Sequence, residues 1–579
     1  METLEKVKNQ TKTTTKTGQL VTGAEAVILS LIEEGVVDIF GYPGGAIMPV
    51  YDALFDYNHR LNHFLVRHEQ GATHAAQGYA RVSGKVGVCL ATSGPGATNL
   101  ITGIADAKID STPLLCITGQ VYSHLLGSDA FQETDVIGIS MPVTKWNYQI
   151  TKAEEITEIM AKAFYLARSG RPGPVLIDIT KDAQLEKVIF NYKKCELIRS
   201  YIAKPRLDMA KLAEASDLIN RARKPYLIFG QGVLLAEAQD IIKAFIEKTG
   251  IPAACTLLGL SAISSDHPLN MGMLGMHGNY GPNIKTNQCD LLIAVGMRFD
   301  DRVTGDLNNY AKQAKIIHIE IDPTEINKNV KVDLAINADA KEALKALFPL
   351  VKPNSYPEWL KDFEEAYQVE KKKVIDHDLY PQSEELKMGE VIRIISELTN
   401  NEAILVSDVG QHQMVANRYY NFSQPRSSVT SGGLGTMGFA LPASIGAKLA
   451  KPERQVVAVI GDGGFQMTIQ EMATIAQYKI PIKIVILNNQ YLGMVRQWQQ
   501  LFFNKRYSST PMVNPEFTLV AKGFGIASAK VTKREDLVKS IKTMVESPTA
   551  FLVEVVVEKE DNIFPMIAPG ESVSDIRLE

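Results

Sequence analysis

The sequence repeats one pattern three times: short apolar runs, each long enough for a buried strand, alternate with stretches long enough for a helix. The runs VVDIF, VGVCLAT and PLLCIT form the first set, PYLIFG, DLLIAVG and IIHIEI the second, and AILVSD, VVAVIGD, IKIVILNN and AFLVEVVV the third. Parallel strands need a helical crossover between them and are buried on both faces. The pattern therefore predicts an α/β protein with three doubly wound parallel-sheet domains. The first and third sets share a strand-and-loop style that hints at duplication.

Changes in composition place the domain boundaries. A chain of 579 residues is several times longer than a typical domain of ~100–200 residues. We expect a polar, Thr/Lys-rich N-terminal tail at 1–18, a domain at 19–190, a second at 191–350, a charged linker at 351–384, a third domain at 385–557 and a C-terminal tail at 558–579.

Charge and composition exclude some partners. Lys and Arg number 61 and Asp and Glu 65, with both signs interspersed, so the chain lacks the basic surface that binds nucleic acid. No run approaches the ~20 apolar residues that cross a membrane. The start of the chain lacks the apolar core of a secretory signal, and the five cysteines form no C-x-x-C pair, which is typical of a reducing compartment. We expect a soluble, cytoplasmic protein.

Two polar groups follow neighbouring strands of the third domain. The run Val456–Ile460 ends at Gly461-Asp462-Gly463, a crossover helix is predicted from Gln466 to Tyr478, and a second strand from Ile482 ends at Asn488-Asn489. Oxygens of Asp462 and Asn489 would lie at the same sheet edge, where they could ligate Mg²⁺, and the glycines would let the backbone approach a diphosphate. An isolated G-D-G is more often an ordinary strand-to-helix turn, but the Asn pair at the next strand end favours the metal site.

This G-D-G and N-N arrangement resembles the thiamine-diphosphate motif of the thiamine-dependent enzymes. The resemblance implies that Asp462 and Asn489 supply side-chain oxygens to Mg²⁺, that Tyr491 supplies a backbone carbonyl, and that the metal and the loop at Gly463 hold the cofactor's diphosphate.

Glu69 lies where an apolar run ending at Arg67 meets a helix of small residues. On position alone it could equally be a buried acid or an acidic residue that compensates the helix dipole. The segments R-H-E-Q-G-A and S-G-P-G-A-T-N (93–99) resemble the pyrimidine-binding domain of the same enzymes, which implies that Glu69 activates the cofactor. In that family the glutamate and the diphosphate site come from different subunits, so a homodimer or homotetramer with interfacial active sites is implied.

Four further motifs narrow the resemblance to the catalytic subunit of acetohydroxyacid synthase, also called acetolactate synthase. They are G-Y-P-G-G-A (41–46), D-A-F-Q-E-T-D (129–135), G-R-P-G-P (170–174) and R-F-D-D-R-V-T-G (298–305). The last resembles the FAD-containing biosynthetic enzymes, although alone it would be read as a surface ion-pair cluster. The resemblance implies a chiefly structural FAD held by Arg171, Gly230, Gly232, Arg298, Arg302, Glu320 and Asp339.

The same resemblance assigns residues to the catalytic centre. It implies that Gly45 and Gln132 surround the reacting groups and that Phe131 and Lys181 complete the approach of the substrate. It also implies that a second group bends the bound thiamine; this group comprises Val409, Gly435 and Met437. Without the flanking motifs, Met437 and Val409 would pass as core residues, and Phe131 and Gln132 as loop residues.

Met494 and Trp498 are one helical turn apart and share a helix face, for which core packing is the default interpretation. By resemblance, Met494 lines the substrate pocket, Trp498 sets the preference for 2-oxobutanoate over pyruvate, and Arg302 holds the second substrate's carboxylate. The tail at 558–579 resembles the family's C-terminal lid.

The implied reaction is decarboxylation of pyruvate and transfer of its two-carbon unit. Transfer to a second pyruvate gives 2-acetolactate, and transfer to 2-oxobutanoate gives 2-aceto-2-hydroxybutanoate, the first common step of valine, leucine and isoleucine biosynthesis. A separate small regulatory subunit is implied as a partner. Two alternatives stay open, a flavin-free catabolic acetolactate synthase and a thiamine-dependent pyruvate oxidase; a non-catalytic relative would have lost Glu69 or Asp462.

Overall fold

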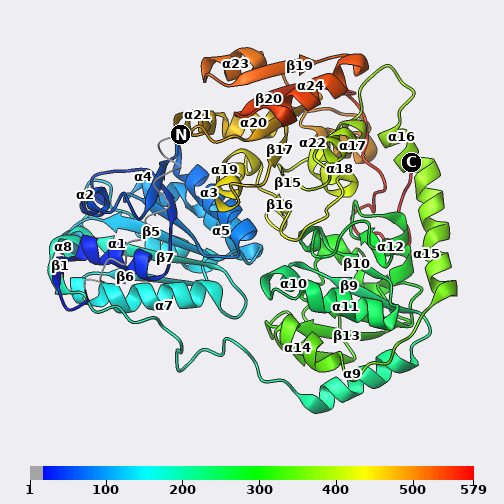
Figure 1. Cartoon of the computed structure of the whole chain (residues 1–579), viewed down its shortest axis with the longest axis horizontal. Coiled ribbons are helices and arrows are strands. Elements are labelled where there is room, and N and C mark those ends of the chain that lie inside the picture. The colour runs from blue at the N-terminus through cyan, green and yellow to red at the C-terminus, as the bar shows by residue number, and fades with distance from the viewer. Residues whose placement is uncertain (1–16) are drawn as a thin grey trace.

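The structure, a computed structural model, describes residues 17–579 and consists of three α/β domains (Figure 1). Each domain has a six-stranded parallel sheet with helices on both faces, as predicted from the alternating pattern. Most strands are buried along their whole length because helices cover both faces, which explains their continuous apolar runs. Of the predicted N-terminal tail, residues 1–16 lie outside the described residues.

The first domain has the strand order β3-β2-β4-β5-β7-β6. Its strands are β2 (Asp38–Gly41), β3 (Asn62–Leu65), β4 (Gly87–Ala91), β5 (Leu114–Gln120), β6 (Trp146–Ile150) and β7 (Pro174–Thr180). Its helices are α1 (Gly23–Glu33), α2 (Met48–Asp56), α3 (Glu69–Ser83), α4 (Pro95–Asn99), α5 (Ile101–Ile109), α6 (Val136–Ser140), α7 (Ile156–Arg168) and α8 (Lys181–Leu185). A separate antiparallel pair joins β1 (Leu20–Thr22) to β8 (Lys187–Ile189).

The third domain has the order β16-β15-β17-β18-β20-β19. Its strands are β15 (Ile404–Ser407), β16 (Ser428–Thr430), β17 (Val456–Gly461), β18 (Lys483–Asn488), β19 (Ala527–Val531) and β20 (Phe551–Val556). Its helices are α17 (Met388–Leu398), α18 (Gln411–Tyr419), α19 (Ala440–Ala450), α20 (Asp462–Met467), α21 (Met472–Tyr478), α22 (Gly493–Phe502), α23 (Phe517–Gly523) and α24 (Arg534–Glu546). Counted along the chain, both sheets run second, first, third, fourth, sixth, fifth, so the first and third domains share one topology.

The central domain has a different order, β11-β10-β9-β12-β13-β14. Its strands are β9 (Pro225–Phe229), β10 (Ala253–Cys255), β11 (Asn270–Met273), β12 (Leu291–Val295), β13 (Lys315–Glu320) and β14 (Leu334–Asn337), and its helices are α9 (Met209–Arg221), α10 (Gln231–Leu235), α11 (Gln239–Thr249), α12 (Tyr280–Thr286), α13 (Asp301–Thr304) and α14 (Ala340–Leu347). This is the 3-2-1-4-5-6 strand order of dinucleotide-binding sheets. All the strands are parallel, and the point at which the strand order reverses lies between β9 and β12.

The segment predicted as a linker, 351–384, is largely helical. It contains α15 (Pro357–Glu370), a π-helical turn (Lys371–Ile375) and α16 (Asp376–Leu379). Trp359, Phe363 and Ala366 recur at helical spacing and are buried against the central domain, where the Trp359 indole N–H donates to the Pro225 carbonyl at 2.9 Å. Most charged side chains of this segment are exposed or partly exposed, Glu370 being a buried exception, and their number hid the helical spacing of the apolar residues.

Small residues bring the first and third domains into contact along α3 and α19. A Cβ atom added to Gly78 would lie 1.9 Å from the Ala443 carbonyl oxygen, and one added to Gly446 would lie 1.7 Å from that of Ala75. Glycine is therefore required on both helices for the backbones to approach this closely. The carboxyl edges of the two sheets are fixed relative to each other by this contact.

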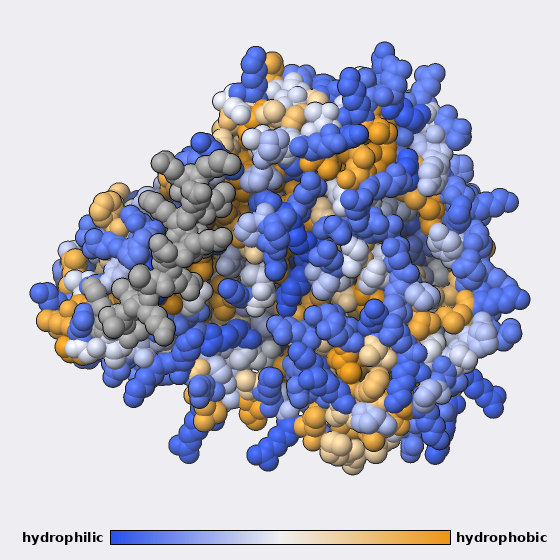
Figure 2. Space-filling model, in the orientation of Figure 1, coloured by the Kyte–Doolittle hydropathy of each residue, from blue (hydrophilic) through white to orange (hydrophobic). Residues whose placement is uncertain are grey.

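The surface agrees with the interspersed charges of the sequence. On the face in Figure 2, hydrophilic residues spread over all three domains and apolar residues form small separate groups. Within residues 17–579, no helix has both the length and the apolar composition needed to span a membrane.

Candidate active site

The polar residues predicted to bind metal lie together at the carboxyl edge of the third sheet. β17 and β18 are parallel neighbours with Gly461 opposite Leu487, so Asp462 and Asn489 follow strands that end side by side. Both side chains are buried, with 1% and 4% of their surface exposed. They line a small cavity of about 50 Å³ together with Tyr491. The prediction that these residues meet at one sheet edge is confirmed.

The bonding around this cavity suits a cation held by oxygen. Asn514 Nδ2 donates to Asp462 Oδ2 at 2.6 Å, and Asn489 Oδ1 accepts from the Tyr491 N–H at 3.2 Å. Burial raises the pKa of Asp462 to about 6. No lysine or arginine is among the described residues that line the cavity, and Asp462 is their one carboxylate. Within residues 17–579 there is no cluster of three or more His, Cys, Asp or Glu side chains that could hold a metal ion by themselves. A cation bound beside Asp462 would therefore need amide and carbonyl oxygens as its other ligands.

The crossover after β17 differs from the prediction of one helix from Gln466 to Tyr478. Helix α20 begins directly at Asp462, and a 3-10 turn (Ile469–Glu471) separates it from α21. The break occurs at Thr468, whose hydroxyl donates to the Gly438 carbonyl at 2.9 Å and whose backbone leaves the helical region. Because α20 starts at the strand end, its first N–H groups face the cavity.

Three polar residues at this site were not identified from the sequence. Gln411 and His412 line the cavity, and Gln411 Oε1 accepts from Asn489 Nδ2 at 3.1 Å. In the described chain, Nε2 of His412 is buried without a hydrogen-bond partner, and burial lowers the pKa of this imidazole to about 3. Gln411 and His412 follow the carboxyl end of β15, and this position in the sequence could have identified them as site residues. Asn514 lies outside regular structure, far along the chain, and had no such signal.

Two of the three residues predicted to bend thiamine line the same cavity, and the third, Gly435, lies next to one of them. Val409 and Met437 line it, and a Cβ atom on Gly463 would lie 3.6 Å from Met437 Cε. Gly435 has φ +66°, a conformation that favours glycine, and a Cβ added there would lie 3.8 Å from Val409 Cγ1. The structure therefore brings these three residues to the carboxyl edge that carries Asp462.

Glu69 and the remaining predicted catalytic residues lie at the carboxyl edge of the first sheet. Glu69 is the first residue of α3, with 9% of its surface exposed, and Asn99 Nδ2 donates to its Oε2 at 2.9 Å. Gly45 follows β2, Gln132 follows β5, and Lys181 follows β7, with its Nζ 5.9 Å from the Tyr122 ring centre. None of these residues lines the cavity at Asp462.

Phe131 and Gln132 occupy an exposed loop of this edge. Phe131 has 89% of its surface exposed, and Gln132 has φ +60°. The exposed loop belongs to the same edge as Glu69.

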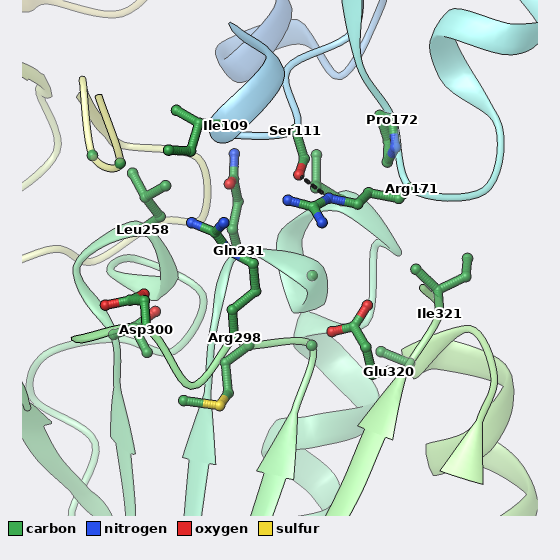
Figure 3. Close-up of a pocket in the computed structure, with 18 of the residues that line it drawn as sticks. Ile109, Ser111, Arg171, Pro172, Gln231, Leu258, Arg298, Asp300, Glu320 and Ile321 are labelled. Carbon is green, nitrogen blue, oxygen red and sulfur yellow. Dashed lines mark hydrogen bonds between the residues drawn. The ribbon is translucent and has the colours of Figure 1, made fainter. Parts of the chain in front are cut away.

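A much larger cavity, of about 1500 Å³, lies where the three domains meet (Figure 3). It is larger than the ~300–1,000 Å³ of most small-molecule sites. Six of the seven residues predicted to contact FAD line it, namely Arg171, Gly232, Arg298, Arg302, Glu320 and Asp339. Gly230 does not line it, because this residue packs beneath the surface, where an added Cβ would lie 2.6 Å from the Gly296 carbonyl oxygen.

Charged groups from two domains face each other across this cavity. Figure 3 shows Arg171 and Ser111 of the first domain opposite Arg298 and Glu320 of the central domain. Arg171 Nε donates to Ser111 Oγ at 2.8 Å, and its Nη1 forms an ion pair with Glu325 at 2.8 Å. Burial raises the pKa of Glu320 to about 7. These groups lie at the carboxyl edge of a sheet with the dinucleotide-binding strand order.

The large cavity extends towards the residues predicted to bend thiamine. Met494 and Trp498 of α22 both line it, as their shared helix face predicted, and so do Arg302 and Gly435. Met494 and Val409 line the small cavity as well. The two cavities are thus neighbours, and of the predicted substrate residues Met494 lies between them.

Comparison with known proteins identifies the family to which this chain belongs. Three family models match: the N-terminal TPP binding domain of thiamine pyrophosphate enzymes over 21–139, the central domain over 212–347 and the C-terminal TPP binding domain over 408–555. The chain is 45% identical over 556 residues to the acetolactate synthase isozyme 2 large subunit of Escherichia coli, covering 96% of this chain and 99% of that protein. It is also 45% identical to the acetolactate synthase large subunits of Lactococcus lactis (95% of this chain, 94% of that protein) and Corynebacterium glutamicum (96% and 90%). The chain therefore belongs to the thiamine-dependent enzymes and, within them, to the family of acetolactate synthase large subunits.

Proposed function

We propose that the chain is the catalytic subunit of an FAD-containing acetohydroxyacid synthase. It takes pyruvate as the first substrate and pyruvate or 2-oxobutanoate as the second, and it forms 2-acetolactate or 2-aceto-2-hydroxybutanoate for branched-chain amino-acid biosynthesis in the cytoplasm. The observation that carries this proposal is the pair of adjoining cavities, one built around Asp462 and Asn489 and the other bordered by Met494, Trp498 and Arg302.

The small cavity fits thiamine diphosphate with Mg²⁺. A buried carboxylate without a basic partner, an amide oxygen and the start of a helix form a donor set for a cation and an anionic diphosphate. Asp462, Asn489 and the Tyr491 carbonyl would hold the metal. When bound, thiamine diphosphate supplies the electron sink that 2-oxo acid decarboxylation needs.

Glu69 provides a proton-transfer group for that chemistry. Asn99 binds its Oε2, which leaves Oε1 to exchange a proton with the cofactor's pyrimidine nitrogen. Gly45 and Gln132 would surround the reacting groups, and Phe131 and Lys181 would complete the substrate's approach. Arg302 suits a substrate carboxylate, because a guanidinium can donate two parallel hydrogen bonds.

The large cavity fits FAD in size and in its position on the central sheet. Gly232 packs so closely on Gly296 that a Cβ would lie 2.6 Å from the Gly296 Cα, and Gly232 also lines the cavity at the turn after β9, where dinucleotide-binding sheets bind their ligand. Arg171, Arg298, Glu320 and Asp339 would contact the flavin nucleotide. The flavin's role here is structural, because the net reaction transfers no electrons.

A homodimer, alone or as half of a homotetramer, completes the active site. Glu69 and Asp462 lie on carboxyl edges of different domains, and Glu69 lines neither cavity. In the proposed dimer the exposed Phe131 loop beside Glu69 would face a second copy, whose third domain would supply the diphosphate site. A separate small subunit would regulate the assembly, as the term large subunit in the relatives' names suggests.

Product analysis tests the proposal. The purified chain is given pyruvate, thiamine diphosphate, Mg²⁺ and FAD, with and without 2-oxobutanoate. We expect acetolactate alone in the first case and largely acetohydroxybutanoate in the second, both dependent on FAD. Acetate formed with flavin reduction would indicate an oxidase, and full activity of colourless protein would indicate a flavin-free synthase; either result would overturn the proposal.

A further inference from the structure

The loop that carries Gly435 and Met437 is held by a carboxylate from another domain. After β16, the N–H groups of Gly432 and Gly433 donate to Asp110 Oδ2 at 2.8 Å and Oδ1 at 2.7 Å. Asp110 caps the C-terminus of α5 in the first domain and has 1% of its surface exposed. Both oxygens of one buried carboxylate thus bind consecutive backbone N–H groups of the third domain.

Arg81 of α3 completes this connection. Its Nη2 forms an ion pair with Asp110 Oδ2 at 2.7 Å, and its Nη1 donates to the Thr430 carbonyl at 2.7 Å. The two side chains are 7% and 0% exposed. A buried ion pair is stabilising only when its remaining hydrogen bonds are satisfied, and here the loop backbone satisfies several of them.

Asp106, one helical turn before Asp110, binds the same loop differently. Its Oδ1 accepts from the hydroxyls of Ser431 and Thr436, the latter at 3.0 Å. In the described chain its Oδ2 is buried and has no hydrogen-bond partner. Asp106 therefore uses one oxygen and hydroxyl donors, whereas Asp110 uses both oxygens and N–H donors.

Close packing leaves the loop little freedom once it is bound. A Cβ atom on Gly433 would lie 2.8 Å from Ile109 Cγ1, and one on Gly432 would lie 2.9 Å from Leu258 Cδ1. The loop thus contacts the first domain on one side and the central domain on the other. A shift of the residues at its start would be passed on to Gly435 and Met437, two and four positions later.

We propose that Asp110, supported by Arg81, is a positioning residue that sets the place of Gly435 and Met437 and thereby the affinity for thiamine diphosphate. The proposal rests on the function proposed above. Asp110 does not line either cavity and acts only through the loop. Misplacement of a cofactor-binding loop by a fraction of an ångström weakens binding and catalysis even when the binding residues are intact.

The neighbouring aspartates offer a matched pair of variants. In Asp110→Asn, one oxygen becomes an NH₂ group that faces an N–H donor, so one backbone bond is lost. In Asp106→Asn, Oδ1 still accepts from both hydroxyls and the NH₂ replaces the oxygen that has no partner. We expect Asp110→Asn to raise the thiamine diphosphate concentration for half-maximal activity about tenfold or more, and Asp106→Asn to change it less than about twofold.

Two readouts separate positioning from general damage. Hydrogen exchange of the apoprotein measures the segment 430–438 directly, and it should be faster in Asp110→Asn but not in Asp106→Asn. Exchange of the central sheet, β9 to β14, should be equal in both variants. If Asp110→Asn does not fold, Arg81→Lys replaces it, because an ammonium group cannot bind Asp110 and the Thr430 carbonyl as the two guanidinium nitrogens do.

Equal effects of the two asparagine variants on thiamine diphosphate affinity, or unchanged exchange of 430–438 in Asp110→Asn or Arg81→Lys, would overturn the proposal. Failure of the proposed function is distinguishable, since the unmodified chain would then neither bind thiamine diphosphate nor form acetolactate, whereas the exchange experiment would still report on the loop.

Discussion

Replacement of Glu471 by alanine is expected to loosen the turn that precedes Glu69. Glu471 belongs to the third domain and has none of its surface exposed. Its Oε1 accepts from the backbone N–H groups of Arg67 at 2.9 Å and His68 at 3.1 Å, and its Oε2 accepts from the Thr474 hydroxyl at 2.8 Å. One side chain therefore binds the two residues directly before Glu69.

The cost follows from the donors that lose their acceptor. A buried donor left without a partner costs about 1–3 kcal/mol, and two N–H groups lose their acceptor here, which gives about 2–4 kcal/mol because both are only partly buried. Thr474 does not add to this, since its hydroxyl can donate to the Leu65 carbonyl at 3.2 Å. For a domain of this size the loss corresponds to a fall of about 4–16 °C in the unfolding temperature.

Glu471→Gln is the matched control. Its oxygen can accept both N–H bonds, and its NH₂ can donate to the Thr474 oxygen, so we expect a change of less than about 1 kcal/mol. Calorimetry of the three proteins measures the stability, and kcat at saturating cofactor measures the placement of Glu69. Equal unfolding temperatures for the alanine and glutamine variants would refute the argument, as would an alanine variant with unchanged kcat.

Four further outcomes are expected. Asp462→Asn removes the one carboxylate of the small cavity's described lining and should raise the Mg²⁺ concentration for half-maximal activity at least about tenfold, measured by titration, with bound FAD unchanged. Trp498→Leu should lower the ratio of acetohydroxybutanoate to acetolactate formed from mixed substrates; an unchanged ratio would exclude a role in specificity. Burial raises the pKa of Glu320 from 4.5 to about 7, so between these pH values the folded apoprotein binds more protons than the unfolded chain. The free energy of unfolding should therefore fall by on the order of 3 kcal/mol as the pH rises from 4.5 to 7. In thermal unfolding, Glu320→Gln should make the stability depend less on pH over this range. Glu370→Gln weakens the partner of the fully buried Arg418, 2.6 Å away, and should cost about 3–5 kcal/mol, seen as a lower unfolding temperature.

The strand ends of the third domain could be predicted because both parts of the signal are local. A continuous apolar run identifies a buried parallel strand, and the polar residues that follow it must lie at the carboxyl edge. Asp462 and Asn489 met for this reason, and so did Met494 and Trp498, whose spacing fixes a common helix face. Neither inference needed any contact between distant segments.

The structure differs from the sequence patterns, or adds to them, where local patterns were ambiguous. The segment 351–384 has so many charges that it resembles a linker, yet three apolar residues at helical spacing suffice to dock it as α15. The helix after β17 starts four residues earlier than predicted, because the helix begins directly at the strand end and is then broken at Thr468. In both cases packing against a neighbouring element overrode composition.

Contacts between domains had no local signal at all. Asp106 and Ser431 are 325 positions apart, and Arg67 and Glu471 are 404 apart. Nothing in the residues around Asp106 separates it from a solvent-exposed acid on a helix. Such pairs are defined by how the first and third domains dock through α3 and α19, which is a property of the whole fold.

The carboxylates of Glu471 and Asp110 connect the first and third domains in opposite directions, and together they limit how the carboxyl edges of the two sheets can move. Glu471 of the third domain holds the turn before Glu69 of the first, and Asp110 of the first holds the loop before Gly435 of the third. A rigid-body shift of one domain would break both connections, whereas local loosening would break one. If Glu471→Ala lowers kcat without weakening thiamine diphosphate binding, and Asp110→Asn does the reverse, each carboxylate acts locally on its own edge. Because the two edges of one chain would serve different active sites in the proposed dimer, local action also means that each site can be perturbed without the other.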